Sequence, residues 1–131
     1  MRQRNKKHRP YQIKKTGIKD ENIDRQILAI HSAIADKLIS QPELIEQVKM
    51  QLEQRKELGR LSYSQYITWY SILELIGAPD RFKTAVLEDT PKMRKFRRNT
   101  PFVNILTEGE RQKALKSNSI GEITDLDNVV F

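Results

Sequence analysis

The chain has 131 residues, enough for one small domain. Hydrophobic residues make up 37% and charged residues 31%, so we expect part of the length to lie outside a packed core. Cysteine is absent, which excludes disulfides, thiolate metal sites and cysteine nucleophiles. There is no run of about 18 apolar residues and no apolar segment after the N-terminal charges, so we expect a cytoplasmic protein without a membrane span or secretory signal.

The net charge of +7 is concentrated in the first 19 residues. They include eight basic residues and no acidic one, whereas the remaining positions carry 16 basic and 17 acidic residues. We predict a disordered basic arm over residues 1–19, because such a segment buries too little apolar surface to offset the entropy of ordering. Its candidate nucleic-acid-binding residues, which would contact phosphates, are Arg2, Arg4, Lys6, Lys7, Arg9, Lys14, Lys15 and Lys19. The alternative is an arm that aids solubility or lies against an acidic partner protein.

Apolar residues at positions 23, 27, 30, 34 and 38 follow the helix period, so an amphipathic helix is predicted over 21–39, with Asp20 as its N-cap. His31 lies at the edge of this stripe, and we interpret it as a boundary histidine paired with a neighbour rather than a catalytic base. Ser40 to Glu43 has the form of a capping box with an early proline, which predicts a second helix over 42–58. The short linker favours an antiparallel hairpin of these two helices.

Gly59 is expected to end the second helix in a left-handed cap, and Ser62 to open a third. The third helix carries Tyr63, Tyr66, Trp69 and Tyr70, which we interpret as core residues, with a base-stacking platform as the alternative. Gly77-Ala78-Pro79 ends it, and a short fourth helix is predicted over 79–88.

Thr90-Pro91 is predicted to cap a fifth helix that carries a second basic cluster. Met93 and Phe96 give this helix an apolar face. The candidate partner or phosphate contacts are Lys92, Arg94, Lys95, Arg97 and Arg98. The alternative is a solvated basic face on a packed helix. Thr107 and Glu110 have capping-box spacing and are expected to start a last helix that ends near Lys116.

The charge of the sequence becomes negative near the C-terminus. Glu122, Asp125 and Asp127 precede Val129-Val130-Phe131. We predict an acidic, apolar-ended tail over 118–131, which either folds back on the second basic cluster or adds to a partner surface. The expected organisation is therefore an arm at 1–19, a helical domain at 20–117 and this tail.

No catalytic residue, metal site or cofactor is predicted. His8 and His31 are the two histidines, and their spacing does not support a zinc site. No glycine-rich phosphate loop is present, and the serines near the tyrosines have no histidine oriented by an acid. We therefore do not expect an enzyme.

Residues 96–111, FRRNTPFVNILTEGER, resemble a pattern in short bacterial proteins: Arg-Arg, Ser or Thr, Pro-Phe, a small aliphatic pair and a capped helix with Glu-Arg. Those proteins also carry an aromatic helix like YITWYSIL at 66–73. The resemblance covers about residues 25–116, and Asn104 stands where the pattern has glycine. Some of these proteins look like antitoxins or accessory partners in two-gene systems, so the resemblance implies an interaction module.

We predict an all-α fold, a small bundle of five to six helices with a disordered basic N-terminal arm. Its expected core is Ile27, Ile30, Ile34, Leu38, Leu44, Val48, Leu52, Tyr66, Trp69, Tyr70, Leu73, Phe82, Val86, Phe96, Phe102 and Leu106. Two hypotheses for function follow. In the first, a non-catalytic, antitoxin-like or accessory module binds a partner protein through its helical body. In the second, an accessory nucleic-acid-binding protein contacts phosphates through its arm.

Overall fold

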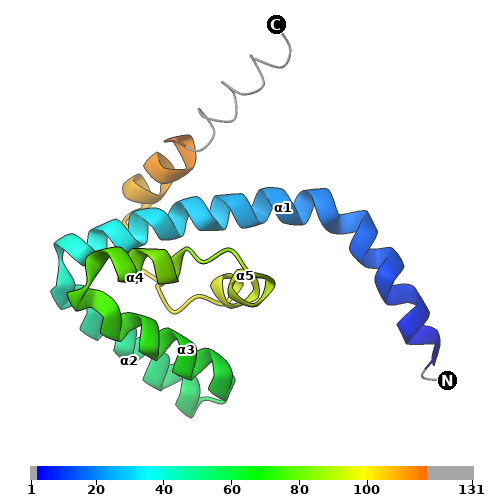
Figure 1. Cartoon of the computed structure of the whole chain (residues 1–131), viewed down its shortest axis with the longest axis horizontal. Coiled ribbons are helices and arrows are strands. Elements are labelled where there is room, and N and C mark those ends of the chain that lie inside the picture. The colour runs from blue at the N-terminus through cyan, green and yellow to red at the C-terminus, as the bar shows by residue number, and fades with distance from the viewer. Residues whose placement is uncertain (1–2, 118–131) are drawn as a thin grey trace, which may run out of the picture.

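The computed structural model describes residues 3–117, with side chains from residue 21 onward, and this part of the chain is all-α (Figure 1). The predicted class, a small helical bundle, is confirmed. The predicted tail at 118–131 lies outside the described residues. The helical elements are α1 (Gln3–Ser40), the 3-10 segment η1 (Pro42–Leu44), α2 (Ile45–Glu57), α3 (Tyr63–Leu73), the 3-10 segment η2 (Glu74–Gly77), α4 (Pro79–Val86), α5 (Pro91–Arg98) and a last helix over 108–117.

Helix α1 is longer than the predicted helix and is the longest helix among the described residues. Its C-terminal half packs against α4 and α5, while its N-terminal part bends and runs clear of the body (Figure 1). Asp20 therefore lies inside α1 and is not its N-cap. The backbone of residues 3–19, the predicted arm, continues α1 as helix and projects from the body (Figure 1).

Most predicted helix ends are found where the sequence places them. Gly59 adopts φ +70°, the left-handed conformation that ends α2, and the hydroxyls of Ser62 and Thr90 accept hydrogen bonds from the amides of Gln65 and Met93. The predicted capping box at Ser40 is wrong. Ser40 is the last residue of α1, and its hydroxyl donates to the carbonyl of Lys37 rather than capping the next helix.

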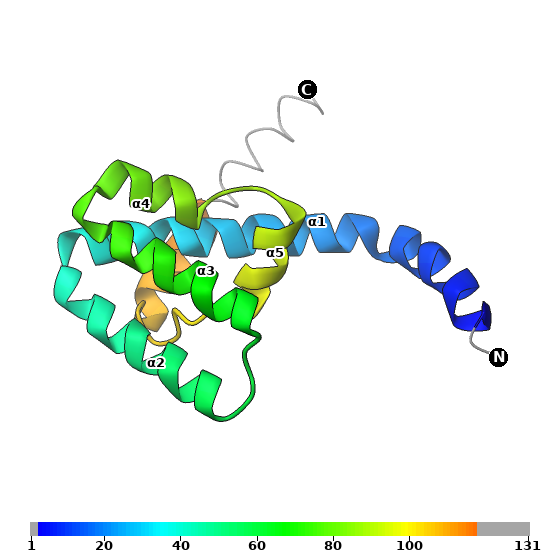
Figure 2. The same ribbon diagram turned by 60° about the horizontal axis from the view of Figure 1, so that its bottom comes forward.

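The predicted antiparallel hairpin of the first two helices is also wrong. α2 leaves the end of α1 at an open angle and runs antiparallel to α3 instead (Figure 2). The reason is local. The 3-10 turn η1 follows α1 directly and redirects the chain, so α2 pairs along its length with the next helix in sequence.

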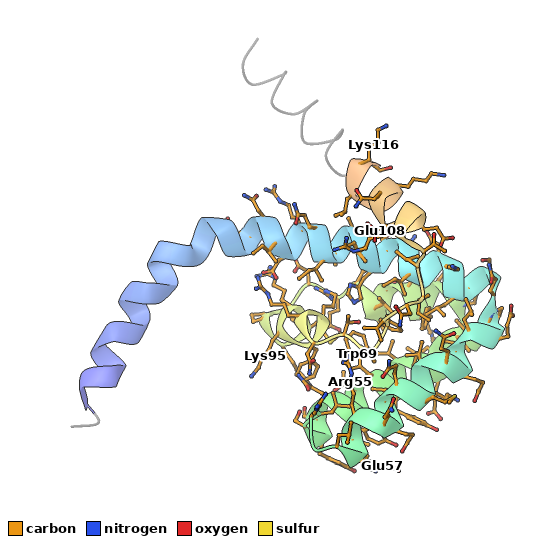
Figure 3. All side chains as sticks on the ribbon, turned by 180° about the vertical axis from the view of Figure 1, so that it is seen from behind. Arg55, Glu57, Trp69, Lys95, Glu108 and Lys116 are labelled. Carbon is orange, nitrogen blue, oxygen red and sulfur yellow. The ribbon has the colours of Figure 1, made fainter. Side chains whose placement is uncertain are left out.

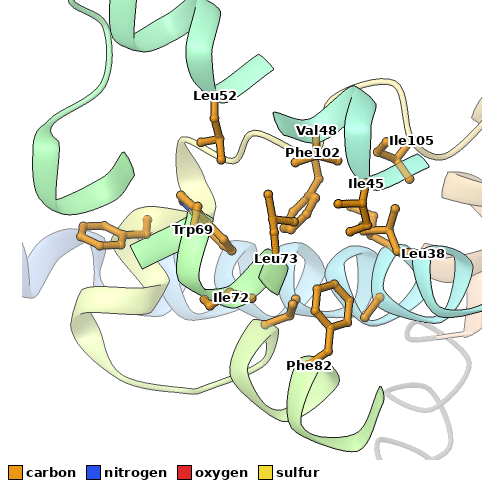
Figure 4. Packing of buried hydrophobic residues seen from close by; sticks show 14 of the residues in the cluster. Leu38, Ile45, Val48, Leu52, Trp69, Ile72, Leu73, Phe82, Phe102 and Ile105 are labelled. Atoms are coloured by element: carbon orange, nitrogen blue, oxygen red, sulfur yellow. The ribbon is translucent and has the colours of Figure 1, made fainter. Parts of the chain in front are cut away.

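One apolar core fills the space between α1, α2, α3 and α4 (Figure 4). Trp69, Leu73, Leu52, Phe82 and Leu38 are fully buried there, as predicted. Six predicted core residues are only half-buried: Ile27, Ile30, Leu44, Tyr66, Tyr70 and Leu106. Their neighbours Ile45, Ile72 and Ile105 fill the core instead.

Within the described residues, no helix is both long enough and apolar enough to cross a membrane.

Candidate functional site

The second basic cluster lies on α5, which Thr90 caps and which Met93 and Phe96 anchor in the core. Lys92 and Lys95 are exposed, and Lys95 lies on the outer side of the helix (Figure 3). The Lys92 ammonium lies 5.6 Å from the centroid of the Phe96 ring. The predicted cationic surface on α5 therefore consists chiefly of two lysines.

Arg97, predicted as a partner or phosphate contact, is instead part of the interior. It is 3% exposed, and one guanidinium nitrogen donates to the carbonyls of Val86 at 2.9 Å and Glu88 at 2.8 Å. Burial lowers the pKa of Arg97, while Asp89 opposes that shift. Those carbonyls lie at the last residue of α4 and just beyond it, where backbone oxygens lack helical partners, so Arg97 satisfies them and holds α5 to α4.

The other two arginines of the cluster form ion pairs within the chain. Arg94 donates to Asp89 at 2.6 Å, and this hydrogen bond lowers the pKa of Asp89. Arg98 reaches Asp24 of α1 with two of its nitrogens, each at 3.0 Å from one carboxylate oxygen. Arg98 thus binds an internal carboxylate and joins α5 to α1.

The other candidate phosphate contacts are placed on the projecting part of α1. Arg4, Lys6, Lys7, Arg9, Lys14, Lys15 and Lys19 follow one another along its backbone, and Arg2 lies outside the described residues. The structure does not bring this segment together with α5, which packs on α1 closer to the body (Figure 1).

His31 is paired with neighbours, as the sequence indicated, but it is buried rather than at the boundary of the core. Its Nδ1 donates to the carbonyl of Ile27 at 2.7 Å, which leaves Nε2 to accept the hydroxyl proton of Thr100 at 2.9 Å. The Thr100 hydroxyl in turn accepts from the amide of Phe102 at 3.2 Å. Burial lowers the pKa of His31 to about 4. The ring is therefore neutral near pH 7 and fixes the segment that follows α5 against α1.

The segment 99–107 turns back along α1 and is held by its own side chains. Phe102 packs edge-on against Trp69, with ring centroids 5.2 Å apart. Asn104 adopts φ 63°, so the glycine expected there is replaced by a residue that tolerates the left-handed conformation. The predicted capping box is present, because Thr107 accepts from the amide of Glu110 and Glu110 accepts from the amide of Thr107. Glu110 also accepts from Lys37, which ties the last helix to α1.

A groove lies between α1 and this segment, with a cavity volume of about 350 Å³. Its apolar walls include Ile27, Ile30 and Leu106, which explains why these predicted core residues are only half-buried. Its polar lining includes Arg98 and Arg111. Among the described residues that line it, none is acidic. We call it the α1 groove.

The aromatic residues of α3 divide between two sides of the helix. Trp69 is fully buried, whereas Tyr63 is 73% exposed and Tyr66 and Tyr70 are half-buried. The Tyr66 hydroxyl donates to Glu53 of α2, and this bond raises the pKa of Tyr66 to about 12. The Lys56 ammonium lies 4.4 Å from the Tyr66 ring centroid, and that of Lys49 5.5 Å from Tyr70. A stacking platform made of all four aromatic residues is therefore not formed.

These tyrosines belong to an exposed apolar surface on the outer side of α2 and α3. Tyr63, Tyr66, Ile67 and Tyr70 share one stripe of α3, because they stand three and four residues apart. Met50 of α2, 71% exposed, lies beside Tyr70 along a shallow hollow between the two helices. We call the surface formed by Met50, Tyr63, Tyr66, Ile67 and Tyr70 the tyrosine face. The sequence interpretation missed it, because it assigned the aromatic residues of α3 to the core.

Among the described residues, no three histidine, cysteine, aspartate or glutamate side chains come together in a way that would hold a metal ion. Comparison with known proteins found no matching family model, no matching curated protein and no matching solved structure.

Proposed function

We propose that the protein is a non-catalytic interaction module, antitoxin-like or accessory in kind, whose helical body binds a partner protein through the tyrosine face. The observation that carries the proposal is the exposure of Tyr63, Ile67 and Met50 on two helices that already bury a complete core on their other side. Tyrosine and methionine are enriched in protein interfaces, and tyrosine is frequent among the residues that dominate binding energy.

The charges around this surface favour a protein partner over a nucleic acid. Three glutamates, Glu46, Glu53 and Glu57, line the hollow beside Met50 against one lysine, Lys49, so this side of the surface is acidic on balance and would repel phosphates. Glu53 and Lys56 fix Tyr66 in place, so part of the entropy lost on binding is lost already in the free protein. A partner with an apolar patch and basic residues at its rim fits this arrangement.

The test is recovery of the partner from the cell that makes the protein, before and after nuclease treatment. We expect a protein partner to be retained after nuclease by the wild-type chain and lost by a Tyr63→Ser, Ile67→Ser double variant. Lys95→Ser, on the exposed side of α5, serves as the matched control and is expected to retain it. Equal recovery by the double variant and the wild type would contradict the tyrosine face as the binding surface.

A second candidate function is contact with nucleic acid through residues 1–19. The projection of the basic part of α1 away from the body favours it, because a phosphate backbone has access to that segment from all sides (Figure 1). The two functions are compatible. Loss of the recovered complex on nuclease treatment, with the tyrosine face intact, would favour this second candidate.

A further inference from the structure

The α1 groove has the dimensions and lining of a peptide-binding site. Its half-buried apolar residues, Ile27, Ile30, Val103 and Leu106, form walls that the described part of the chain leaves uncovered. Such surface gains stability when an apolar side chain removes it from water. Arg98 and Arg111 stand among these residues. The groove therefore fits a segment that combines apolar side chains with acidic ones.

The chain itself contains a segment of this composition. Residues 125–131 read DLDNVVF, in which two aspartates precede three apolar residues. Arg98 already forms an ion pair with Asp24. Arg111 lies 4.0 Å from Glu108, and an exposed ion pair of this kind contributes little to stability. Arg111, with a half-exposed side chain, is thus available to a further carboxylate.

The distance is also suitable. Arg111 lines the groove from the helix over 108–117, so the last described residue lies less than two helical turns beyond it, about 9 Å along the axis. Residues 118–124 span up to about 23 Å when extended. This length is enough for the chain to reverse and return to the groove. A short linker also gives the attached segment a high effective concentration, in the millimolar range.

We propose that residues 125–131 dock in the α1 groove of the same chain. The apolar side chains of Val129, Val130 and Phe131 lie along Ile27, Ile30 and Leu106, and Asp125 or Asp127 pairs with Arg111. This contact is separate from the tyrosine face, so it stands or falls independently of the proposed function.

The absence of native cysteine permits a direct test by disulfide formation in the full-length chain. Val103 lines the groove, so a Val103→Cys, Val130→Cys variant places one thiol in the site and one on the docked segment. Met50→Cys with the same Val130→Cys change is the matched control, because Met50 is more exposed but lies on the opposite pair of helices. Under mild oxidation of dilute protein, we expect the groove pair to form an intramolecular disulfide at least about tenfold faster than the control pair.

A second measurement tests the charge contact. Arg111→Glu in the groove-pair variant is expected to slow disulfide formation, and adding Asp125→Arg and Asp127→Arg is expected to restore it. Circular dichroism confirms that each variant keeps its helices. Equal rates for the groove and control pairs would overturn the proposal. Predominant formation of disulfide-linked dimers would also overturn it, because the groove would then accept the segment of a second copy.

Discussion

Burial disfavours the protonated form of His31 in the folded protein. The Thr100 hydroxyl donates to Nε2 and accepts from the Phe102 amide, so a proton on Nε2 would also require that hydroxyl to turn its own proton away from the ring. The pKa of about 4 in the folded state lies below the usual value of 6.5. The unfolded chain therefore binds this proton more readily than the folded chain does, and acid favours unfolding.

We predict that the contribution of His31 to stability is complete above pH 6.5 and is lost as the pH falls towards about 4. The loss across this window amounts to roughly 3 kcal/mol. Urea denaturation at a series of pH values checks it, with His31→Gln as the variant that cannot titrate. The wild type is expected to lose more stability than the variant between pH 6.5 and pH 4. Parallel pH profiles for the two proteins would contradict the assignment.

Trp69 and Phe102 meet at the centre of the core, and each is expected to matter greatly to stability. Truncation of either to alanine is predicted to cost roughly 3–5 kcal/mol. Trp69→Phe is expected to cost much less, because the buried indole nitrogen has no hydrogen-bond partner within the described residues and its loss leaves no acceptor unpaired. Thermal and urea denaturation of the three variants check this order. Wild-type stability in both alanine variants would show that the two rings do not pack as described.

At the scale of elements, the connection of α5 to α4 depends on Arg97. Arg97→Met keeps much of the side-chain volume but leaves the carbonyls of Val86 and Glu88 without their donor, so we predict a loss of about 2 kcal/mol. Lys95→Met, two residues earlier and exposed, is the control and is expected to be near neutral. Similar stabilities for the two variants, measured by urea denaturation, would contradict the structural role of Arg97.

The sequence contains enough information to place most of the elements but not their packing. Gly59, Thr90 and Thr107 mark helix ends through short-range chemistry, and all three mark them where predicted. Ser40 fails because the same residue types also occur at the last turn of a helix, and the choice depends on how the chain continues. The path of α2 after η1 was not accessible either, because it is set by contacts with α3.

The same limit applies to the site residues. A basic residue beside Phe96 was interpreted as surface, but Arg97 also stands four residues after Met93 and therefore on the buried side of α5. The spacing of Arg97 from Met93 indicated a buried position, but its positive charge led to the interpretation as a surface residue. Conversely, Tyr66 and Tyr70 were placed in the core by their helical spacing, but they are only half-buried against it, and Tyr63 and Ile67 of the same helix are exposed.

At the scale of the whole molecule, charge and packing are segregated. Within the described residues, Arg94 and Arg98 of α5 form internal ion pairs that link this helix to the segment after α4 and to α1. Residues 1–19 carry the net positive charge and stand outside these contacts (Figure 1). Removal of residues 1–19 is therefore expected to change the electrostatic attraction to phosphates without unfolding the body.

We predict that a shortened chain beginning at Asp20 keeps its helical body but loses most of its affinity for nucleic acid at low salt. For the full chain, the logarithm of the binding constant is expected to fall linearly with the logarithm of the salt concentration. The slope is about −0.9 per phosphate contacted on duplex DNA and about −0.7 on a single strand, and we expect roughly four to six contacts. Salt titrations of both chains on one duplex and one single strand provide the measurement. If the two chains bind equally at low salt, the basic segment does not contact phosphates, and partner binding through the tyrosine face stands alone.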